Sequence, residues 1–218
     1  SGLKQCYIRP LAYYGYGTMG LTPLKNNVDV SISCWEWKMG ESKAGKFSGA
    51  KCKISKWIRI DSRSQPMQAK SAANYSNAAL ARVEALKNGF DEAIMLTQDG
   101  YVSEGSGENL FMINDGAIFT PPVSDNNLTG ITRDSAIEIA NQTLGIEVIE
   151  RRIRRSELYF ADEVFLTGTA AHIQAVGYLD NRTIGSGESG PITSKINAVY
   201  QEAIRGNHVD FKDWCTGI

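Results

Sequence analysis

Tight-turn pairs recur along the chain and constrain its fold more than any other feature. Asp99-Gly100, Asp115-Gly116 and Asp180-Asn181 each separate two short apolar runs. Such pairs favour β-hairpins, because Gly, Asn and Asp tolerate the positive φ of a two-residue turn. Helical patterns lie between these hairpins without regular strand–helix alternation. The sequence therefore predicts an α+β fold with a mixed sheet rather than a doubly wound parallel sheet.

Apolar periodicity predicts where the elements lie. One helix is expected over 69–87, with Ala72, Tyr75, Ala79, Val83 and Leu86 on one face. Thr132 is expected to cap a later helix, because its hydroxyl can accept a free backbone N–H. Strands are predicted at 6–11, 28–34, 51–60, 93–97, 101–104, 109–113, 117–120, 147–153 and 164–167, and further helices at 132–144, 156–161 and 191–205.

Composition excludes several classes of protein. The 23 Lys and Arg nearly balance the 24 Asp and Glu, so no net field favours nucleic acid or an anionic membrane. No apolar run approaches the length of a membrane span, and no secretion signal opens the chain. The four cysteines form no C-x-x-C pair and the two histidines lie far apart, which predicts reduced thiols, a cytoplasmic protein and no metal site.

The stretch 38–50 is rich in Gly, Lys and Ser and is the best candidate linker. A long hairpin loop within one domain fits its composition equally well. We expect residues 1–37 to form the C-terminal part of a small domain, 38–50 an interdomain loop, and 51–218 the large domain. The abrupt strand at the start suggests a larger protein that has been shortened.

Lys70 stands among small and apolar residues, and Tyr75 follows five positions later. A buried amine loses its charge more easily and becomes a nucleophile toward aldehydes. If the segment is helical, the phenol lies about one turn from the amine. The alternative is an ordinary lysine at the start of a helix.

Two further regions carry groups suited to a charged planar ligand. Glu104 is expected at a strand end beside Gly105 and Gly107, where it could hold a ring nitrogen protonated. The segment 128–132 leads into a helix whose free N–H groups favour a phosphate, and 167–171 is a second small-residue loop suited to an anion. The alternatives are a bulged hairpin with a solvated acid, an ordinary helix start and a plain turn.

Several segments together resemble the branched-chain amino acid aminotransferases, class IV enzymes of fold type IV that use pyridoxal 5′-phosphate. The resemblance covers essentially the whole chain and implies mostly antiparallel sheets in a pseudobarrel with flanking helices, plus the tail of a small α/β domain. It implies a cytoplasmic enzyme of amino-acid biosynthesis that moves amino groups from Leu, Ile or Val to 2-oxoglutarate. The matching segments are CYIRP (6–10), QAKSAANY (68–75), YVSEGSGENLF (101–111), LTGITR (128–133) and ADEVFLTGTAA (161–171).

The resemblance also assigns roles to the cofactor-binding residues. Lys70 forms the Schiff base with the cofactor aldehyde and later shuttles a proton. Tyr75 hydrogen-bonds the phenolic oxygen of the cofactor, and Glu104 pairs with its ring nitrogen. Around the phosphate, it implies Leu128, Gly130, Ile131, Thr132 and Thr169.

For the substrate, the resemblance implies Tyr7 and the N–H groups of Ala170 and Ala171 at the α-carboxylate, with Thr169 beside them. Arg9 resembles the residue that meets the side-chain carboxylate of glutamate, and Trp37 resembles part of the apolar pocket wall. One pocket must accept both side chains, and an unpaired buried charge is costly.

Some positions depart from the family pattern. His172 stands where a glutamate is common, and Ala72-Ala73 replace paired glycines. The family's small domain, which supplies an arginine to the phosphate and shares in a homodimer, is expected to precede this chain. The alternatives are a D-amino acid aminotransferase, an amine transaminase, an aminodeoxychorismate lyase, or an inactive fragment that keeps the fold.

Overall fold

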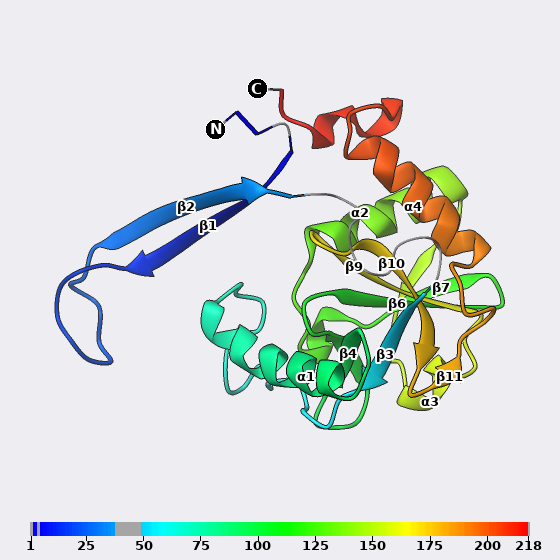
Figure 1. Ribbon diagram of the computed structural model, residues 1–218, viewed down its shortest axis with the longest axis horizontal. Helices are drawn as coiled ribbons and strands as arrows, with labels where there is room; N and C mark the ends of the chain where they lie inside the picture. Colours follow the sequence, from blue (N-terminus) through cyan, green and yellow to red (C-terminus); the bar gives the residue numbers. More distant parts are fainter. Residues whose placement is uncertain (1, 4, 38–48, 218) are drawn as a thin grey trace. The chain divides into compact units, whose positions relative to one another are not determined.

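The computed structural model describes residues 2–3, 5–37 and 49–217. Its backbone divides into two units, Ser1–Gly45 and Lys46–Ile218, each described by itself (Figure 1). Most of the predicted linker, residues 38–48, lies outside the described residues. Gly49 is described, and Ala50 already begins a strand. The three-part division at 37 and 50 stays a prediction.

The first unit is a long antiparallel hairpin of β1 (Cys6–Tyr14) and β2 (Val28–Glu36). Pairing runs from Cys6 opposite Glu36 to Tyr14 opposite Val28. Near the end of the hairpin Tyr7 stacks on Trp35, with ring centroids 5.0 Å apart. Both predicted strands are present and are longer than their apolar runs suggested.

The second unit is built on one mixed sheet. Its strand order is β5-β4-β3-β10-β9-β6-β7-β8, with β11 beside β10. β3 pairs in parallel with β4 and β10, β7 pairs in parallel with β8, and the remaining pairings are antiparallel. The strands are β3 (Ala50–Ile54), β4 (Glu92–Leu96), β5 (Val102–Gly105), β6 (Asn109–Asn114), β7 (Ala117–Thr120), β8 (Val148–Glu150), β9 (Glu163–Gly168), β10 (His172–Leu179) and β11 (Arg182–Thr183).

The sheet curls until its two edges meet. The N–H of Val102 on β5 donates to the carbonyl of Ile153, just beyond β8, at 2.8 Å. Tyr101 and Arg154 form a bridge at the same junction. A sheet joined edge to edge is a barrel, which leaves fewer unpaired strand edges. The predicted α+β fold with a pseudobarrel and flanking helices is confirmed.

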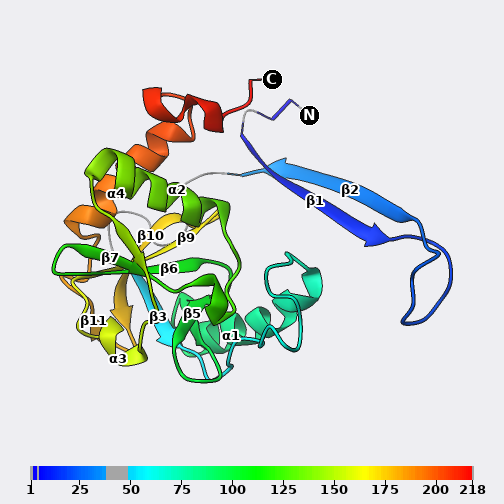
Figure 2. The same cartoon turned by 180° about the vertical axis from the view of Figure 1, so that it is seen from behind.

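Apolar side chains pack on both faces of this sheet. Inside the barrel, a buried cluster includes Cys52, Ile94, Leu110 and Leu166. Outside it, Phe111 and Phe165 stack with ring centroids 4.7 Å apart, beneath helices α2 (Ile131–Ile139) and α4 (Pro191–Ala203). Helix α1 (Tyr75–Lys87) packs on β4 at another part of the surface (Figure 2). Short helical turns complete the fold at η1 (Ala72–Asn74), η2 (Val123–Asp125), η3 (Ala140–Leu144), α3 (Arg155–Leu158) and η4 (Val209–Trp214).

The hairpin turns lie where the sequence predicted them. Asp115 and Gly116 have φ of 49° and 76° between β6 and β7, and Asp180 and Asn181 have 48° and 63° between β10 and β11. Gly100, at 82°, turns β4 back toward β5. These positive angles explain the residue types found there.

Three predictions about the segment from 51 to 87 are wrong. The helix expected from position 69 begins at Tyr75, because Asn74 donates to the carbonyls of Pro66 and Ala69 and holds the preceding chain in turns. The strand expected to reach position 60 ends at Ile54. The expected apolar face of the helix is largely exposed, because the helix instead packs its small residues against Ala93 and Met95 of β4. The buried residues of α1 are Ala78, Ala81 and Ala85.

Candidate active site

A pocket of about 260 Å³ opens where one end of the sheet meets the loop before α1. Four stretches of chain converge on it: 59–75, 104–109, 128–132 and 167–169. Of the predicted site residues, it brings together Lys70, Tyr75, Glu104, Leu128, Gly130, Ile131, Thr132 and Thr169.

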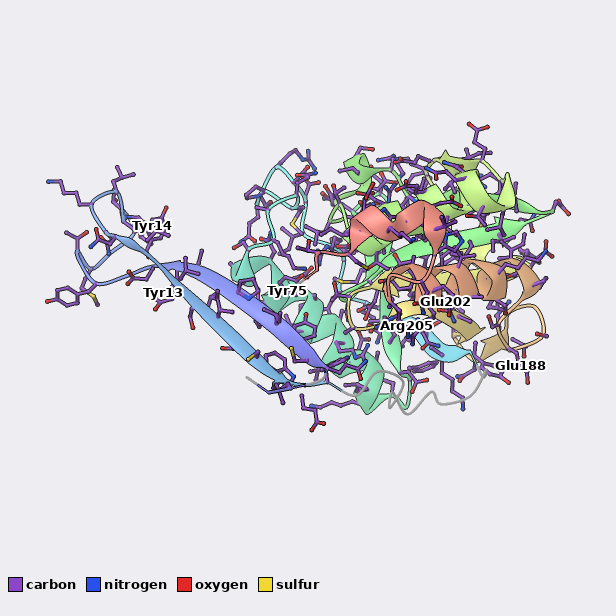
Figure 3. The ribbon with its side chains drawn as sticks, turned by 90° about the horizontal axis from the view of Figure 1, so that it is seen from above. Tyr13, Tyr14, Tyr75, Glu188, Glu202 and Arg205 are labelled. Carbon is purple, nitrogen blue, oxygen red and sulfur yellow. The ribbon has the colours of Figure 1, made fainter. Side chains whose placement is uncertain are left out.

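Lys70 and Tyr75 meet at one side of the pocket. The Lys70 amine donates to the Tyr75 phenol oxygen at 2.8 Å, and Figure 3 labels Tyr75 at the start of α1. The expectation that Lys70 is buried is wrong, because its loop carries the side chain to the open rim of the pocket. The close contact places an amine and a phenol where they can act on the same ligand group.

Glu104 forms the buried wall of the pocket near the end of β5. One carboxylate oxygen lies 2.5 Å from Nη2 of Arg59, and the other accepts the Leu128 N–H at 3.1 Å. Burial raises the pKa of Glu104 to about 7, while the Arg59 charge and the Leu128 hydrogen bond pull it down. The carboxyl group therefore titrates near neutral pH.

The start of α2 forms another wall. Gly130 is the N-cap, and no side chain caps the helix. The prediction that Thr132 is the cap is wrong, because Thr132 is already the second helical residue and its side chain is buried. The first N–H groups of a helix have no partner within it, so this end suits an anionic group. Thr169, just after β9, faces the same pocket.

Other predicted residues fall elsewhere. Leu128 lines the pocket, but its N–H is engaged by Glu104. Ala170 and Ala171 lie in the turn between β9 and β10 and are not among the lining residues. Tyr7, Arg9 and Trp37 belong to the first unit, and their predicted roles stay predictions. There, Trp37 lies against Tyr7, with ring centroids 5.1 Å apart.

Sequence reasoning gave no role to three polar residues of the pocket. Arg59 contacts Glu104, and its one signal is a charge within the apolar run WIRI. Asn109 donates to the Leu128 carbonyl at 2.7 Å and ties β6 to the start of α2. Glu108 accepts the Gly107 N–H at 3.0 Å, and burial raises its pKa.

Among residues 2–3, 5–37 and 49–217, no group of three or more His, Cys, Asp or Glu side chains gathers as metal ligands do. Within the same ranges, no helix combines the length and apolarity needed to cross a bilayer.

The pocket places a primary amine and a buried acid beside an uncapped helix start, an arrangement that suits a small anionic ligand. Residues 1–177 match the family described as amino-transferase class IV. The chain belongs to this family of aminotransferases.

Named relatives agree with this assignment. A probable branched-chain-amino-acid aminotransferase of Aquifex aeolicus is 45% identical over 215 residues, which are 99% of this chain and 68% of that protein. A crystal structure of a branched-chain amino acid aminotransferase from Thermoproteus uzoniensis with norvaline aligns with a TM-score of 0.92 at 38% identity, over 99% of this chain and 70% of that one. The Escherichia coli branched-chain amino acid aminotransferase structure aligns with a TM-score of 0.91 at 40% identity, over 96% of this chain and 69% of that one.

Proposed function

We propose that this protein moves amino groups from branched-chain L-amino acids to 2-oxoglutarate, using pyridoxal 5′-phosphate. One observation carries the proposal: an amine, a phenol and a buried acid line the same pocket as an uncapped helix start. The names of relatives at up to 45% identity support the substrate class. A cytoplasmic location and a homodimer are part of the same proposal.

The donor set of the pocket fits this cofactor. The backbone of Ile131 and Thr132 at the start of α2 suits the phosphate. The Glu104 carboxylate suits the ring nitrogen, and the Lys70 amine suits the aldehyde. The volume of about 260 Å³ suits a single-ring ligand, since sites for drug-sized ligands begin at about 300 Å³. When bound, pyridoxal phosphate supplies an aldehyde that accepts amino groups and a ring that withdraws electrons.

In this proposal, four residues of the pocket have defined roles. With the cofactor bound, the Lys70 amine would take a proton from the substrate α-carbon and deliver it to the C4′ carbon of the cofactor, which requires the uncharged form of the amine. The Tyr75 phenol, 2.8 Å away, orients that amine. Glu104 would accept a hydrogen bond from the protonated ring nitrogen, and Thr169 would add a donor for the phosphate.

Substrate recognition is assigned to residues outside this cluster. The family resemblance assigns the α-carboxylate to Tyr7 of the first unit and to the N–H groups of Ala170 and Ala171 of the second, and we propose both as substrate-binding groups. Arg9 meets the side-chain carboxylate of glutamate, and Trp37 contacts branched apolar side chains. An apolar wall together with the Arg9 side chain would allow one pocket to accept both branched-chain amino acids and glutamate, because the arginine pairs the charge of glutamate.

Covalent labelling tests the cofactor assignment. The protein is titrated with pyridoxal phosphate, reduced with borohydride and digested for mass spectrometry. We expect the label on Lys70, none there after Lys70→Ala, and unchanged labelling after Lys87→Ala at the far end of α1. A label spread over surface lysines and unaffected by Lys70→Ala would contradict the assignment.

An amino-donor panel tests the substrate class. With 2-oxoglutarate as acceptor, we expect L-leucine, L-valine and L-isoleucine to outpace D-alanine. Equal or faster turnover of D-alanine would instead indicate a D-amino acid aminotransferase.

A further inference from the structure

Arg59 is a buried cation beside the acid of the pocket. The Arg59 side chain is almost fully buried. The backbone N–H of Arg59 donates to the Leu96 carbonyl at the end of β4, at 2.8 Å. Its Nη2 lies 2.5 Å from Oε1 of Glu104, and its Nε donates to the Asn126 carbonyl at 3.4 Å. Backbone and side chain are thus both anchored, which fixes the guanidinium at the carboxylate.

The surroundings of Glu104 make the Arg59 charge important for the protonation state of this acid. Burial disfavours the charged carboxylate, and the neighbouring Glu108 disfavours it further. Arg59 is the strongest opposing influence, followed by the Leu128 N–H and, more weakly, Lys70. In the described part of the chain, Arg59 is also the one cation that forms an ion pair with Glu104. Without Arg59, the balance of these effects moves toward the neutral acid.

We propose that Arg59 is a positioning residue that favours the ionised form of Glu104 and holds its carboxylate in place for the ring nitrogen of bound pyridoxal phosphate. The inference rests on the proposed function, because it names the cofactor that Glu104 meets. An ionised carboxylate stabilises a protonated ring nitrogen, whereas a neutral acid does not. Arg59 therefore acts on the cofactor through Glu104 and need not touch it.

The first test uses cofactor-free protein and measures the free energy of urea unfolding from pH 4 to pH 9. The folded pKa of Glu104, about 7, lies above its ordinary value of 4.5. Folded protein therefore holds the proton more tightly, and stability falls as pH rises between these two values. We expect Arg59→Met to extend this fall to higher pH by one unit or more, and Arg59→Lys to stay close to the wild type.

Matched variants isolate the pair. Glu104→Gln is expected to lose this contribution to the pH dependence. Arg63→Met is the control, because Arg63 is an exposed arginine whose partner is Asp61. An Arg59→Met profile that superimposes on the wild type would overturn the proposal.

The second test measures the dissociation constant of pyridoxal phosphate by absorbance titration over the same pH range. In the wild type, affinity is expected to rise as Glu104 ionises. In Arg59→Met this rise should occur at higher pH, with affinity at pH 7 at least tenfold weaker and largely recovered at pH 9. A loss of affinity that is equal at every pH would mean that Arg59 serves only the fold.

If Arg59→Met does not fold, Arg59→Lys and the double variant Arg59→Met/Glu104→Gln decide the matter. Folding rescued in the double variant supports the proposal, because the uncompensated acid has been removed. Folding lost equally in the single and double variants would overturn it. Failure of the proposed function looks different: Lys70 stays unlabelled, while the cofactor-free pH profiles still report on the Arg59–Glu104 pair.

Discussion

The amine nitrogen of Lys70 lies 2.8 Å from the phenol oxygen of Tyr75, although the two residues do not share a helix. Ser71 between them is extended, with ψ of 137°, and a short 3₁₀ turn follows before α1 begins. The Lys70 amine also lies 5.4 Å from the centre of the Tyr75 ring. The contact is therefore made by a turn that bends the lysine back over the helix start.

Replacing Tyr75 with Phe tests what the phenol contributes. We expect kcat of the loaded enzyme to fall roughly tenfold, which is about 1.4 kcal/mol and within the usual range for one hydrogen bond. Stability should hardly change, because the ring is 40% exposed. Steady-state kinetics and urea unfolding check this, with Tyr101→Phe, whose side chain lines a different cavity, as the control. A wild-type kcat in Tyr75→Phe would show that the contact has no catalytic role.

Gly130→Ala tests the junction between β6 and α2. The backbone of Gly130, with φ of −85°, suits any residue, but an added Cβ would lie 2.2 Å from Oδ1 of Asn109. Asn109 is buried and bonded to the Leu128 carbonyl, so it cannot yield easily. We expect a loss of about 1–3 kcal/mol of unfolding free energy and weaker pyridoxal phosphate binding. Gly107→Ala is the control, since nothing lies within 4 Å of its added Cβ, and equal losses in both variants would contradict this reasoning.

Phe165→Ala tests the outer core. Its ring stacks on Phe111 beneath α2 and α4, and both rings are fully buried. Truncation leaves a cavity, so we expect a loss of about 3–5 kcal/mol in urea unfolding. Phe160→Ala should cost less than about 0.5 kcal/mol, because that ring is 81% exposed. Similar losses in the two variants would mean that this stack does not support the fold.

His172 predicts a pH effect of the opposite sign to that of Glu104. Burial, and then the charge of Arg205 near the end of α4 (Figure 3), lower its pKa below the ordinary 6.5. Unfolded protein then binds the proton more tightly, so stability falls as pH drops below 6.5. We expect His172→Asn to flatten this fall in urea unfolding, and Asn tolerates the φ of 56° at this position. The control is His208→Asn, for which we expect the fall to persist, and an unchanged slope in His172→Asn would refute the assignment.

The elements set by local turn chemistry were predictable from sequence. Asp115-Gly116 and Asp180-Asn181 are residue pairs that tolerate the positive φ of a tight turn, and both have positive φ here. Both hairpins therefore lie where they were expected. The start of α1 was not predictable, because Asn74 reaches back to carbonyls of the preceding turn. Its buried face was also missed, since the helix packs alanines rather than its larger apolar side chains against β4.

The sequence by itself predicted the α+β class and eight of the residues that line the pocket, because turn signals and family motifs can be read without knowledge of distant contacts. Only the tertiary structure revealed that Arg59 faces Glu104, that Asn109 ties β6 to the start of α2, and that Lys70 stands at an open rim. These contacts depend on how the curled sheet brings together segments that are far apart in the sequence. Local sequence patterns carry no information about distances between such segments. The charge of the acid at the centre of the pocket depends on the same long-range contacts.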